Sequence, residues 1–316
     1  MSEDVVKGEI RKDYITGSRV IFAFSRDKRQ RDFKNEEVTS NAKDCPFEYG
    51  KENLNKTIKL VGNPWKLRLI YNKYPIVNEE IIHYKNSNFL RRYSNYGHSY
   101  VIIDTPNHLQ KFHEIEENIL QKWFNLIIDT ENTTYSDKRI KQVCTFKDSG
   151  SISGGSLYHQ HTQIIGFTFI SPIIKKEINV IKNNHRKCIL EEALKKEKER
   201  VLIENKNAIA FAPYGSRFRG HSIIMPKRHI DYVGRLDRAE IKSLVKFIKT
   251  ILAKNDKIFD KHSYNLIFHE LKGSKELHFY IEITPRFSNI GSAELSGLYI
   301  NSLTPEEYTK IFNETD

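Results

Sequence analysis

The chain has 316 residues, of which 39% are hydrophobic, and it carries a formal net charge of +11. This length provides core for roughly two domains, and the positive charge favours anionic partners such as nucleotides and sugar phosphates. The three cysteines are too few and too scattered to form a disulfide framework, which excludes the small disulfide-stapled class.

Several other protein classes lack support in the sequence. The first residues, MSEDVVKGEIRKDY, contain no apolar stretch of the kind found in signal peptides. No apolar run approaches the roughly 18 residues that a membrane-spanning helix needs. No helix-turn-helix or RNA-binding motif accompanies the positive charge, so we interpret the lysines as a solvated surface. We expect a soluble, cytoplasmic protein with no membrane partner and no nucleic-acid partner.

The first part of the chain combines a strand with two polar motifs. Residues 18–24, SRVIFAF, are rich in β-branched and aromatic side chains and predict a strand. Arg26 and Arg29 follow in a basic cluster that suits phosphate binding, although a solvated turn explains it equally well. Further on, Cys45 and Glu48 stand three positions apart in CPFE. This pair is compatible with zinc, but it is far less specific than two cysteines.

The middle of the chain predicts three strands and one helix. Residues 66–77 predict a strand that ends in a loop, and residues 98–104, HSYVIID, predict another strand. Residues 114–130 place apolar side chains three and four positions apart, as in an amphipathic helix. Residues 141–147 predict a further strand, which leads the chain into a glycine-rich loop.

The stretch 149–166, SGSISGGSLYHQHTQIIG, indicates chemistry most directly. Its glycines and serines form a loop whose backbone N–H groups can approach an anion closely. Alternate residues of a strand point to one face, so His159, His161 and Gln163 are expected to form one polar row. Such a row beside a phosphate loop predicts phosphoryl transfer. A glycine-rich turn before a strand with partly buried histidines explains the stretch equally well.

The second half of the chain repeats the pattern of the first. After residues 175–202, which predict a long charged helix, residues 220–248 repeat the order found in residues 97–126. Both segments begin with Gly-His-Ser and continue with an apolar strand, a turn histidine and an amphipathic helix. The shared order predicts an internal duplication. It pairs four positions of the first copy with four of the second: His108 with His229, His159 with His278, His161 with Tyr280, and Gln163 with Glu282.

Taken together, the motifs resemble the galactose-1-phosphate uridylyltransferase branch of the histidine-triad superfamily. That branch includes plant-type ADP-glucose phosphorylases and is related to dinucleoside tetraphosphate phosphorylases. The motifs occur in the same order over most of the chain: RKDYITGSRVIFAFSRDKR, CPFE, YNKYP, the His108 turn, GGSLYHQHTQ, and ELHFYIEITPR with residues 294–301. The resemblance implies an α+β fold of two tandem histidine-triad-like repeats, each a mostly antiparallel half-barrel sheet with helices. It also implies a homodimer. We assign residues 1–170 to a catalytic repeat and residues 171–316 to a second, degenerate repeat.

The resemblance implies roles for individual residues. His161 matches the nucleophile, and Gln163 matches the amide that hydrogen-bonds the transferring phosphoryl group. Substrate contacts match at eight further positions: Arg26, Arg29, Asn72, Asp148, Gly154, Gly155, Ser156 and Glu294. The family has asparagine where this chain has Asp148. A negative charge at that position repels a phosphate unless the carboxyl group is protonated or turned away, which leaves the substrate preference open.

The resemblance also implies zinc. One site matches Cys45, Glu48, His108 and His159, with Glu48 in the place of a second cysteine. Glutamate is an acceptable zinc ligand, although the exchange affects metal affinity and identity. Some family members have a second site, for which Glu177, His269 and His278 match three ligands. The fourth position is Tyr280, so we expect this second site to be empty.

The implied activity is nucleotidyl transfer as in galactose metabolism. A neutral imidazole attacks the α-phosphorus of UDP-glucose or another UDP-hexose, and the resulting nucleotidyl-histidine passes its nucleotide to a hexose 1-phosphate. Two alternatives remain open. Phosphate or water could accept the nucleotide from a nucleotide sugar or a dinucleoside polyphosphate, which gives a phosphorylase or a hydrolase. The chain could also bind nucleotides or nucleic acid without catalysis, although the intact pair of His161 and Gln163 argues against this.

Overall fold

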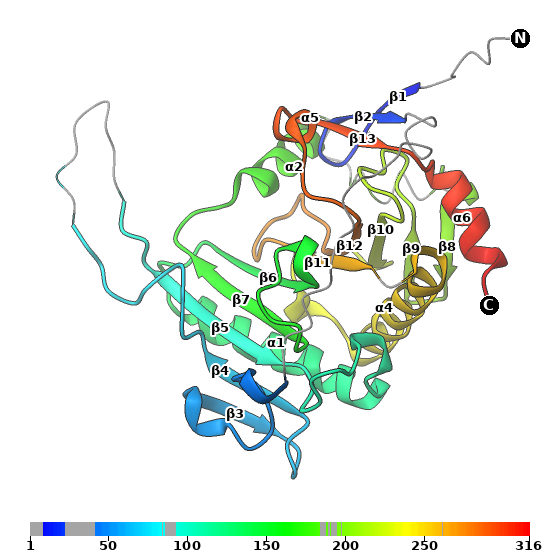
Figure 1. Cartoon of the computed structure of the whole chain (residues 1–316). Coiled ribbons are helices and arrows are strands. Elements are labelled where there is room, and N and C mark those ends of the chain that lie inside the picture. Colours follow the sequence, from blue (N-terminus) through cyan, green and yellow to red (C-terminus); the bar gives the residue numbers. More distant parts are fainter. Residues whose placement is uncertain are drawn as a thin grey trace, which may run out of the picture.

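The computed structural model describes residues 9–22, 42–83, 85, 93–183, 188, 190, 195–196, 198–260 and 262–316. Within them, a ten-stranded antiparallel sheet forms the body of the protein (Figure 1). Its strands follow each other in space as β3 (Thr57–Val61), β4 (Leu67–Tyr71), β5 (Gly97–Ile103), β7 (His161–Phe167), β6 (Gln142–Ser149), β11 (Ser263–His269), β12 (Tyr280–Arg286), β10 (Ser222–Pro226), β9 (Ala208–Phe211) and β8 (Val201–Glu204).

The strand order is symmetric about the junction of β6 and β11. Outward from β6 come β7, β5, β4 and β3, and outward from β11 come β12, β10, β9 and β8. Strand β7 begins at His161 and β12 begins at Tyr280, two positions that the sequence comparison pairs. The predicted α+β fold is confirmed, and the symmetric order supports the duplication. The boundary between residues 170 and 171 stays a prediction, because β6 and β11 join both halves into one sheet.

Two long helices pack on one face of this sheet. Helix α1 (Glu117–Ser136) and helix α4 (Arg238–Phe259) bury their apolar sides in the main core, together with Phe268 of β11. Asp237 caps the start of α4 by accepting hydrogen bonds from the first turn. The indole Nε1–H of Trp123 in α1 donates to Thr162 Oγ1 at 3.1 Å. Because side chains alternate along a strand, His161 and Gln163 point to the opposite face.

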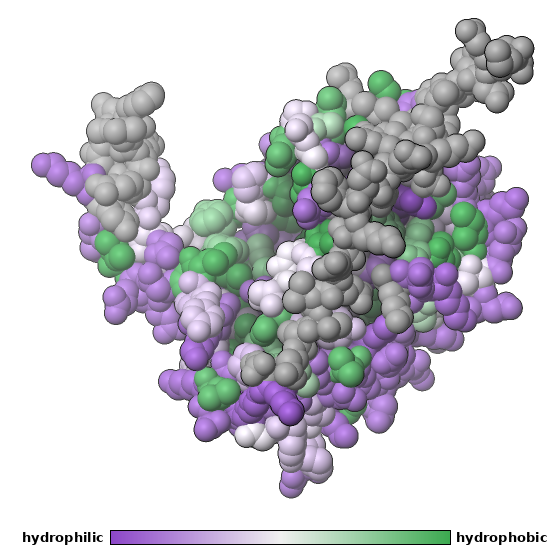
Figure 2. All heavy atoms as spheres, viewed as in Figure 1, coloured by the Kyte–Doolittle hydropathy of each residue, from purple (hydrophilic) through white to green (hydrophobic). Residues whose placement is uncertain are grey.

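Shorter elements complete the chain. The described residues also form the helices α2 (Pro172–Asn183), α5 (Ser292–Leu295) and α6 (Pro305–Glu314), and 3₁₀ turns at Ala42–Asp44, Glu52–Leu54, Phe112–Glu114, Ser151–Ser153, Lys198–Arg200 and Val233–Arg235. Among the described helices, none is both long enough and apolar enough to cross a membrane. Hydrophilic residues cover much of the face shown in Figure 2, with smaller groups of hydrophobic residues between them.

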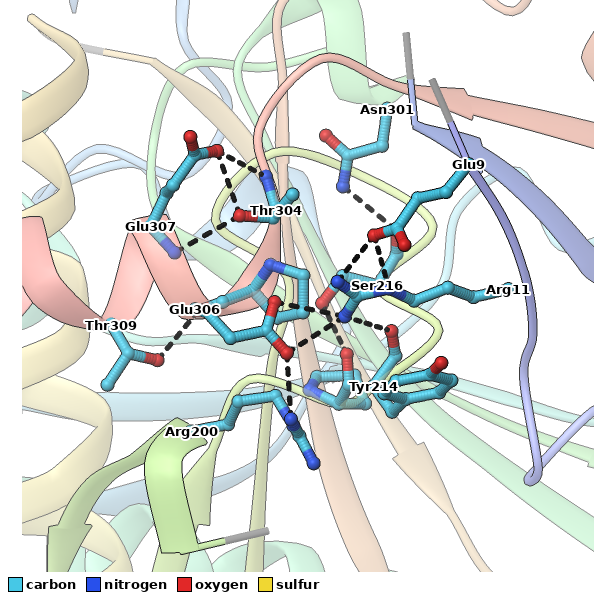
Figure 3. A network of polar contacts seen from close by, with 12 residues as sticks. Glu9, Arg11, Arg200, Tyr214, Ser216, Asn301, Thr304, Glu306, Glu307 and Thr309 are labelled. Atoms are coloured by element: carbon cyan, nitrogen blue, oxygen red, sulfur yellow. Dashed lines mark hydrogen bonds and ion pairs between the residues drawn. The ribbon is translucent and has the colours of Figure 1, made fainter. Parts of the chain in front are cut away.

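A second, three-stranded sheet joins the two ends of the chain. Strand β2 (Arg19–Phe22) pairs antiparallel with β1 (Glu9–Lys12) and parallel with β13 (Leu298–Asn301). Figure 3 shows the ion pairs beside it: the guanidinium of Arg11 lies 2.9 Å from Glu306 Oε1, and that of Arg200 lies 2.7 Å from the same oxygen. Glu306 lies in α6, so the N-terminal segment packs against the second half of the chain.

The predicted helix over residues 175–202 is confirmed for residues 175–183, which lie in α2, and is wrong at its C-terminal end. Helix α2 ends at Asn183, and Val201 and Leu202 belong to β8. Strand β8 pairs with β9, and this long-range pairing, which sequence spacing does not report, decides the conformation. Strand β3 was not predicted. Its side chains are mostly exposed, so its sequence lacks the alternation that marks a half-buried strand.

Two buried glutamates face each other between α1 and β11. Glu131 and Glu270 are both fully buried, Thr145 Oγ1 donates to Glu131 at 2.6 Å, and Val233 N–H donates to Glu270 at 2.8 Å. Burial raises the pKa of Glu131 to about 7. Burial and the neighbouring Glu131 also raise the pKa of Glu270 well above its ordinary value. The pair is therefore stable in the fold only while it holds a proton.

Glu131→Gln should flatten the dependence of stability on pH. The folded chain holds this proton to a higher pH than the unfolded chain, so the free energy of unfolding falls as pH rises from about 4.5 to about 7. The amide of the variant cannot lose a proton. At pH 8 the free energy of unfolding of the variant should therefore exceed that of the wild type by on the order of 2–3 kcal/mol. Urea denaturation at several pH values measures this difference. Glu117→Gln changes an exposed position of the same helix, and its free energy of unfolding should depend on pH as that of the wild type does. The same pH dependence for Glu131→Gln would contradict the role given to Glu131.

Candidate active site

The glycine loop lies between β6 and β7 and requires glycine at three positions. Gly150 has φ = 90°, and a Cβ atom there would collide with the side chain of Ser263. Gly154 has φ = 94°, a left-handed conformation that L side chains rarely adopt. At Gly155 a Cβ atom would come within 2.9 Å of the carbonyl oxygens of Asp148 and Gly150. The turn is therefore too tight for any side chain there, and it leaves Ser156 exposed in the segment that leads to β7.

His161, the predicted nucleophile, is the first residue of β7. Its side chain is 7% exposed, and its Nδ1 lies 2.8 Å from the backbone oxygen of His159. A carbonyl only accepts, so Nδ1 carries the proton and Nε2 keeps its lone pair. Burial, aided by the positive charge of Lys147, lowers the pKa of His161 and favours the neutral ring. Gln163 lies on the same face of the strand and is partly exposed.

A buried ion pair contacts the backbone of His161. The ammonium group of Lys147 lies 2.7 Å from Asp104 Oδ2 and 3.0 Å from the backbone oxygen of His161. The hydroxyl of Thr162 donates to Asp104 as well, at 3.0 Å. This network was not predicted. The signal for it is that Lys147 follows Val143 and Thr145 on the buried side of β6, where a charged residue needs a partner.

The four predicted metal ligands of the first half come together. Their donor atoms in Cys45, Glu48, His108 and His159 all lie within 4.8 Å of one another. Cys45 Sγ lies 3.6 Å from His159 Nδ1, and Glu48 Oε1 lies 3.0 Å from His108 Nδ1 and 3.4 Å from His159 Nδ1. Four ligands around zinc at bond lengths of about 2.0–2.3 Å are separated by roughly 3.3–3.8 Å. The set is close to this spacing.

The surroundings of His159 also fit a metal. Its Nε2 lies 2.7 Å from the backbone oxygen of Thr105, so Nε2 carries the proton and Nδ1 is free for a metal. This is the usual way in which a carbonyl group orients a ligating histidine. The thiol of Cys45 is buried as well. The residues therefore fit zinc, and a metal here would fix the chain directly before His161.

A similar cluster occurs in the second half of the chain and was not predicted. Cys188, His229 and His278 place their donor atoms within 4.8 Å of one another, with Cys188 Sγ 3.4 Å from His278 Nδ1. His278 Nε2 lies 2.9 Å from the backbone oxygen of Pro226, which repeats the contact between His159 and Thr105. The duplication pairs His108 with His229 and His159 with His278, and this pairing could have indicated the second cluster from the sequence. Cys188 lies in the stretch that was predicted as helix.

The expected second group of Glu177, His269 and His278 is arranged differently. His269 lies between two carboxylates, with Nδ1 2.9 Å from Glu177 Oε1 and Nε2 3.0 Å from Glu282 Oε2. Although burial opposes it, these carboxylates raise the pKa of His269 to about 9, which favours a ring that is protonated on both nitrogens and donates to both carboxylates. His278 instead faces Cys188, and the ring of Tyr280 stacks on His269 with the centroids 4.4 Å apart.

The other predicted substrate contacts are dispersed. Asn72 is engaged in the loop after β4, where its amide donates to Ser99 Oγ at 3.2 Å and its Oδ1 accepts from the Tyr74 N–H at 2.9 Å. Glu294 in α5 accepts from the Gly291 N–H at 3.1 Å. Asp148, Gly154, Gly155 and Ser156 lie in and beside the glycine loop. Arg26 and Arg29 lie outside the described residues.

Comparisons with known proteins show what the chain is similar to. A family described as Domain of unknown function (DUF4921) matches residues 109–314, and the N-terminal domain of DUF4931 matches residues 28–170. The ADP-glucose phosphorylase of Arabidopsis thaliana is 28% identical over 97% of this chain and 92% of that protein. The galactose-1-phosphate uridylyltransferase of Thermotoga maritima is 25% identical over 98% of each chain.

Solved structures have the same fold. A crystal structure of the ADP-glucose phosphorylase from Arabidopsis thaliana with bound ADP-glucose superposes with a TM-score of 0.86 at 26% identity, covering 98% of this chain and 99% of that one. A uridylyltransferase structure superposes with a TM-score of 0.77 at 22% identity, covering 97% of each chain, and shows the shared fold. The chain belongs to the DUF4921 family, within the galactose-1-phosphate uridylyltransferase-like branch of the histidine-triad superfamily.

Proposed function

We propose that the chain transfers a nucleoside monophosphate from a nucleotide sugar, with UDP-hexose as the first candidate, to a hexose 1-phosphate through a nucleotidyl group on His161. The observation that carries this proposal is the state of His161. It is buried, its Nδ1 proton is bound by the backbone of His159, and its Nε2 is free at the end of a glycine loop. A neutral imidazole in this tautomer is a competent nucleophile at neutral pH.

The proposed reaction has two displacement steps. In the first, Nε2 of His161 attacks the α-phosphorus, the bond from phosphorus to the bridging oxygen breaks, and a sugar 1-phosphate leaves with the electron pair. In the second, a phosphate oxygen of the acceptor attacks the same phosphorus, and the phosphorus–nitrogen bond returns its pair to Nε2. The amide of Gln163 and the backbone N–H groups of the loop stabilise the charge on the phosphoryl oxygens.

Zinc has a structural role in this proposal. Cys45, Glu48, His108 and His159 would hold it, and it would supply a rigid attachment for the residues before His161 rather than a reacting group. The backbone oxygen of His159 orients the His161 ring, so fixing His159 also fixes the nucleophile. A metal bound there would support the proposed attack through His159, without contact with substrate.

A phosphorylase is the second candidate. It is supported by the relative in Arabidopsis thaliana, whose name describes phosphorolysis of ADP-glucose and which matches 97% of this chain. Both candidates share the first step and differ in the acceptor, which is inorganic phosphate in a phosphorylase. The test is to load the protein with UDP-glucose or ADP-glucose, remove unbound nucleotide, and add one acceptor at a time.

The products distinguish the candidates. We expect hexose 1-phosphate to release a nucleotide sugar, which identifies a transferase. Release of a nucleoside diphosphate by inorganic phosphate alone identifies a phosphorylase, and release of the monophosphate by water alone identifies a hydrolase. If the loaded protein keeps its nucleotide under all three conditions, the proposed function is wrong.

A further inference from the structure

Four strands place one polar row across the face of the sheet that carries His161. Phe146 in β6 is paired with Gln163 in β7, and Asp148 follows two residues later on the same side. Asp148 is paired with Asn265 in β11, which is paired in turn with Thr284 in β12. Arg286 follows Thr284 by two positions. Because paired and alternate residues share a face, Asp148, Asn265 and Arg286 continue the row of His161 and Gln163 into the second half of the chain.

Asn265 holds this row together. It is 8% exposed, and its side-chain amide donates to Asp148 Oδ1 at 2.6 Å and to the backbone oxygen of Ser153 in the glycine loop at 2.8 Å. Its Oδ1 accepts from Arg286 Nη1 at 3.2 Å. One buried residue of the second half therefore fixes the glycine loop, Asp148 and Arg286 in a single arrangement.

Arg286 is suited to binding a phosphate at this position. Its guanidinium is partly buried, lies over the ring of Phe218 with 5.2 Å to the centroid, and uses Nη1 for Asn265. A guanidinium has five N–H donors in a planar fork that matches two phosphate oxygens. The carboxylates of Asp148 and Glu294 act on it electrostatically. Arg286 therefore also balances the negative charge that Asp148 brings to the site.

The position of Arg286 indicates which phosphate it meets. On the β4–β5 side of His161, the ring of Phe47 lies 5.4 Å from the imidazole and packs with Ile70, Val101 and Ile103. These side chains are buried, and Leu157, which packs against them, is partly exposed. The apolar and aromatic character of this side suits a nucleobase better than a phosphate. Arg286 lies on the other side of His161, beyond β6 and β11. With the α-phosphorus at His161, the phosphate farther from the nucleoside points towards Arg286.

We propose that Arg286 binds this distal phosphate, which is the β-phosphate of a nucleotide sugar and the phosphate of the acceptor, and that Asn265 positions Arg286 and the glycine loop. The inference rests on the proposed function, because the direction of the phosphate chain follows from attack by His161. It makes the second half of the chain a direct part of the site, although its own counterparts of His161 and Gln163 are Tyr280 and Glu282.

Nucleotide binding tests the inference. Dissociation constants for AMP, ADP, UMP and UDP are measured by calorimetry for the wild type and Arg286→Gln. We expect monophosphate binding to stay within about twofold, since it does not use the distal site. Diphosphate binding should weaken by about 10- to 100-fold, the effect of losing a charge-assisted hydrogen-bond pair. Arg238→Gln, which removes one positive charge from an exposed position, should match the wild type for all four ligands.

Two further variants sharpen the test. Arg286→Lys keeps the charge and loses the fork, so its diphosphate binding should lie between those of the wild type and Arg286→Gln. Asp148→Asn in the Arg286→Gln background should restore part of the lost diphosphate affinity, because it removes an unbalanced carboxylate. Equal weakening of monophosphates and diphosphates, unchanged diphosphate binding, or no diphosphate binding by the wild type would overturn the inference. Labelling of His161 is recorded separately, so failure of the proposed function is recognised independently of these binding ratios.

Discussion

Replacing His161 with alanine should reduce turnover by at least about 1,000-fold, because the substitution removes the atom that accepts the nucleotide. The side chain of His161 makes one polar contact in the described structure, to the backbone of His159. His161 is not one of the proposed metal ligands. The protein should therefore keep its fold and its metal content. Steady-state rates with a nucleotide sugar and an acceptor measure the loss, and circular dichroism and elemental analysis verify the protein.

Two companion variants separate nucleophile loss from general damage. Gln163→Ala should retain the nucleophile and slow the first step by roughly 2–4 kcal/mol in activation free energy, as expected for one donor to a charged transition state. His83→Ala changes an exposed histidine outside the site and should leave turnover unchanged. Turnover by the His161→Ala protein at a rate near that of the wild type would mean that another residue carries the nucleotide.

Removal of a metal ligand should have the second large effect, on metal content and stability. The wild type should contain about two zinc ions per chain, one at each cluster of histidine and cysteine ligands. His159→Ala should lose one of them and lower the midpoint of thermal unfolding by more than about 10 °C, because metal binding contributes directly to folding. Elemental analysis of chelator-washed protein and calorimetry measure the two effects.

The second cluster provides the matched control. His278→Ala should lose one zinc and keep the other, and it should retain labelling of His161, which lies in the other half of the sheet. A wild-type protein with one zinc ion, still held by His278→Ala, would rule out zinc binding by Cys188, His229 and His278. If the wild-type protein is stable and active without metal, neither cluster is a zinc site.

The parts of the site that sequence could predict are those with local spacing. The glycine loop, His161 and Gln163 stand within a few residues of one another, so strand alternation alone places them on one face. The duplication was readable because it repeats a long ordered pattern, and the symmetric strand order agrees with it. Metal ligands from distant positions were predicted only through the resemblance, since no spacing rule joins Cys45 to His159.

The parts that could not be predicted depend on contacts between distant strands. Nothing in the sequence pairs β6 with β11, so the approach of Asn265 and Arg286 to Asp148 was not readable. The same holds for Lys147 and Asp104, whose ion pair needs β5, β6 and β7 in their observed order. The helix predicted for residues 175–202 was wrong at its C-terminal end, because the pairing of β8 with β9 places Val201 and Leu202 in a strand.

The most direct test of the account is to look for the covalent intermediate. The wild-type protein is mixed with UDP-glucose or ADP-glucose without an acceptor and examined by mass spectrometry, intact and after digestion. The account predicts the gain of one nucleoside monophosphate on His161, stable in alkali and labile in acid, as a phosphorus–nitrogen bond requires. A protein that turns over these substrates with no adduct, or with an adduct on another residue, would contradict it.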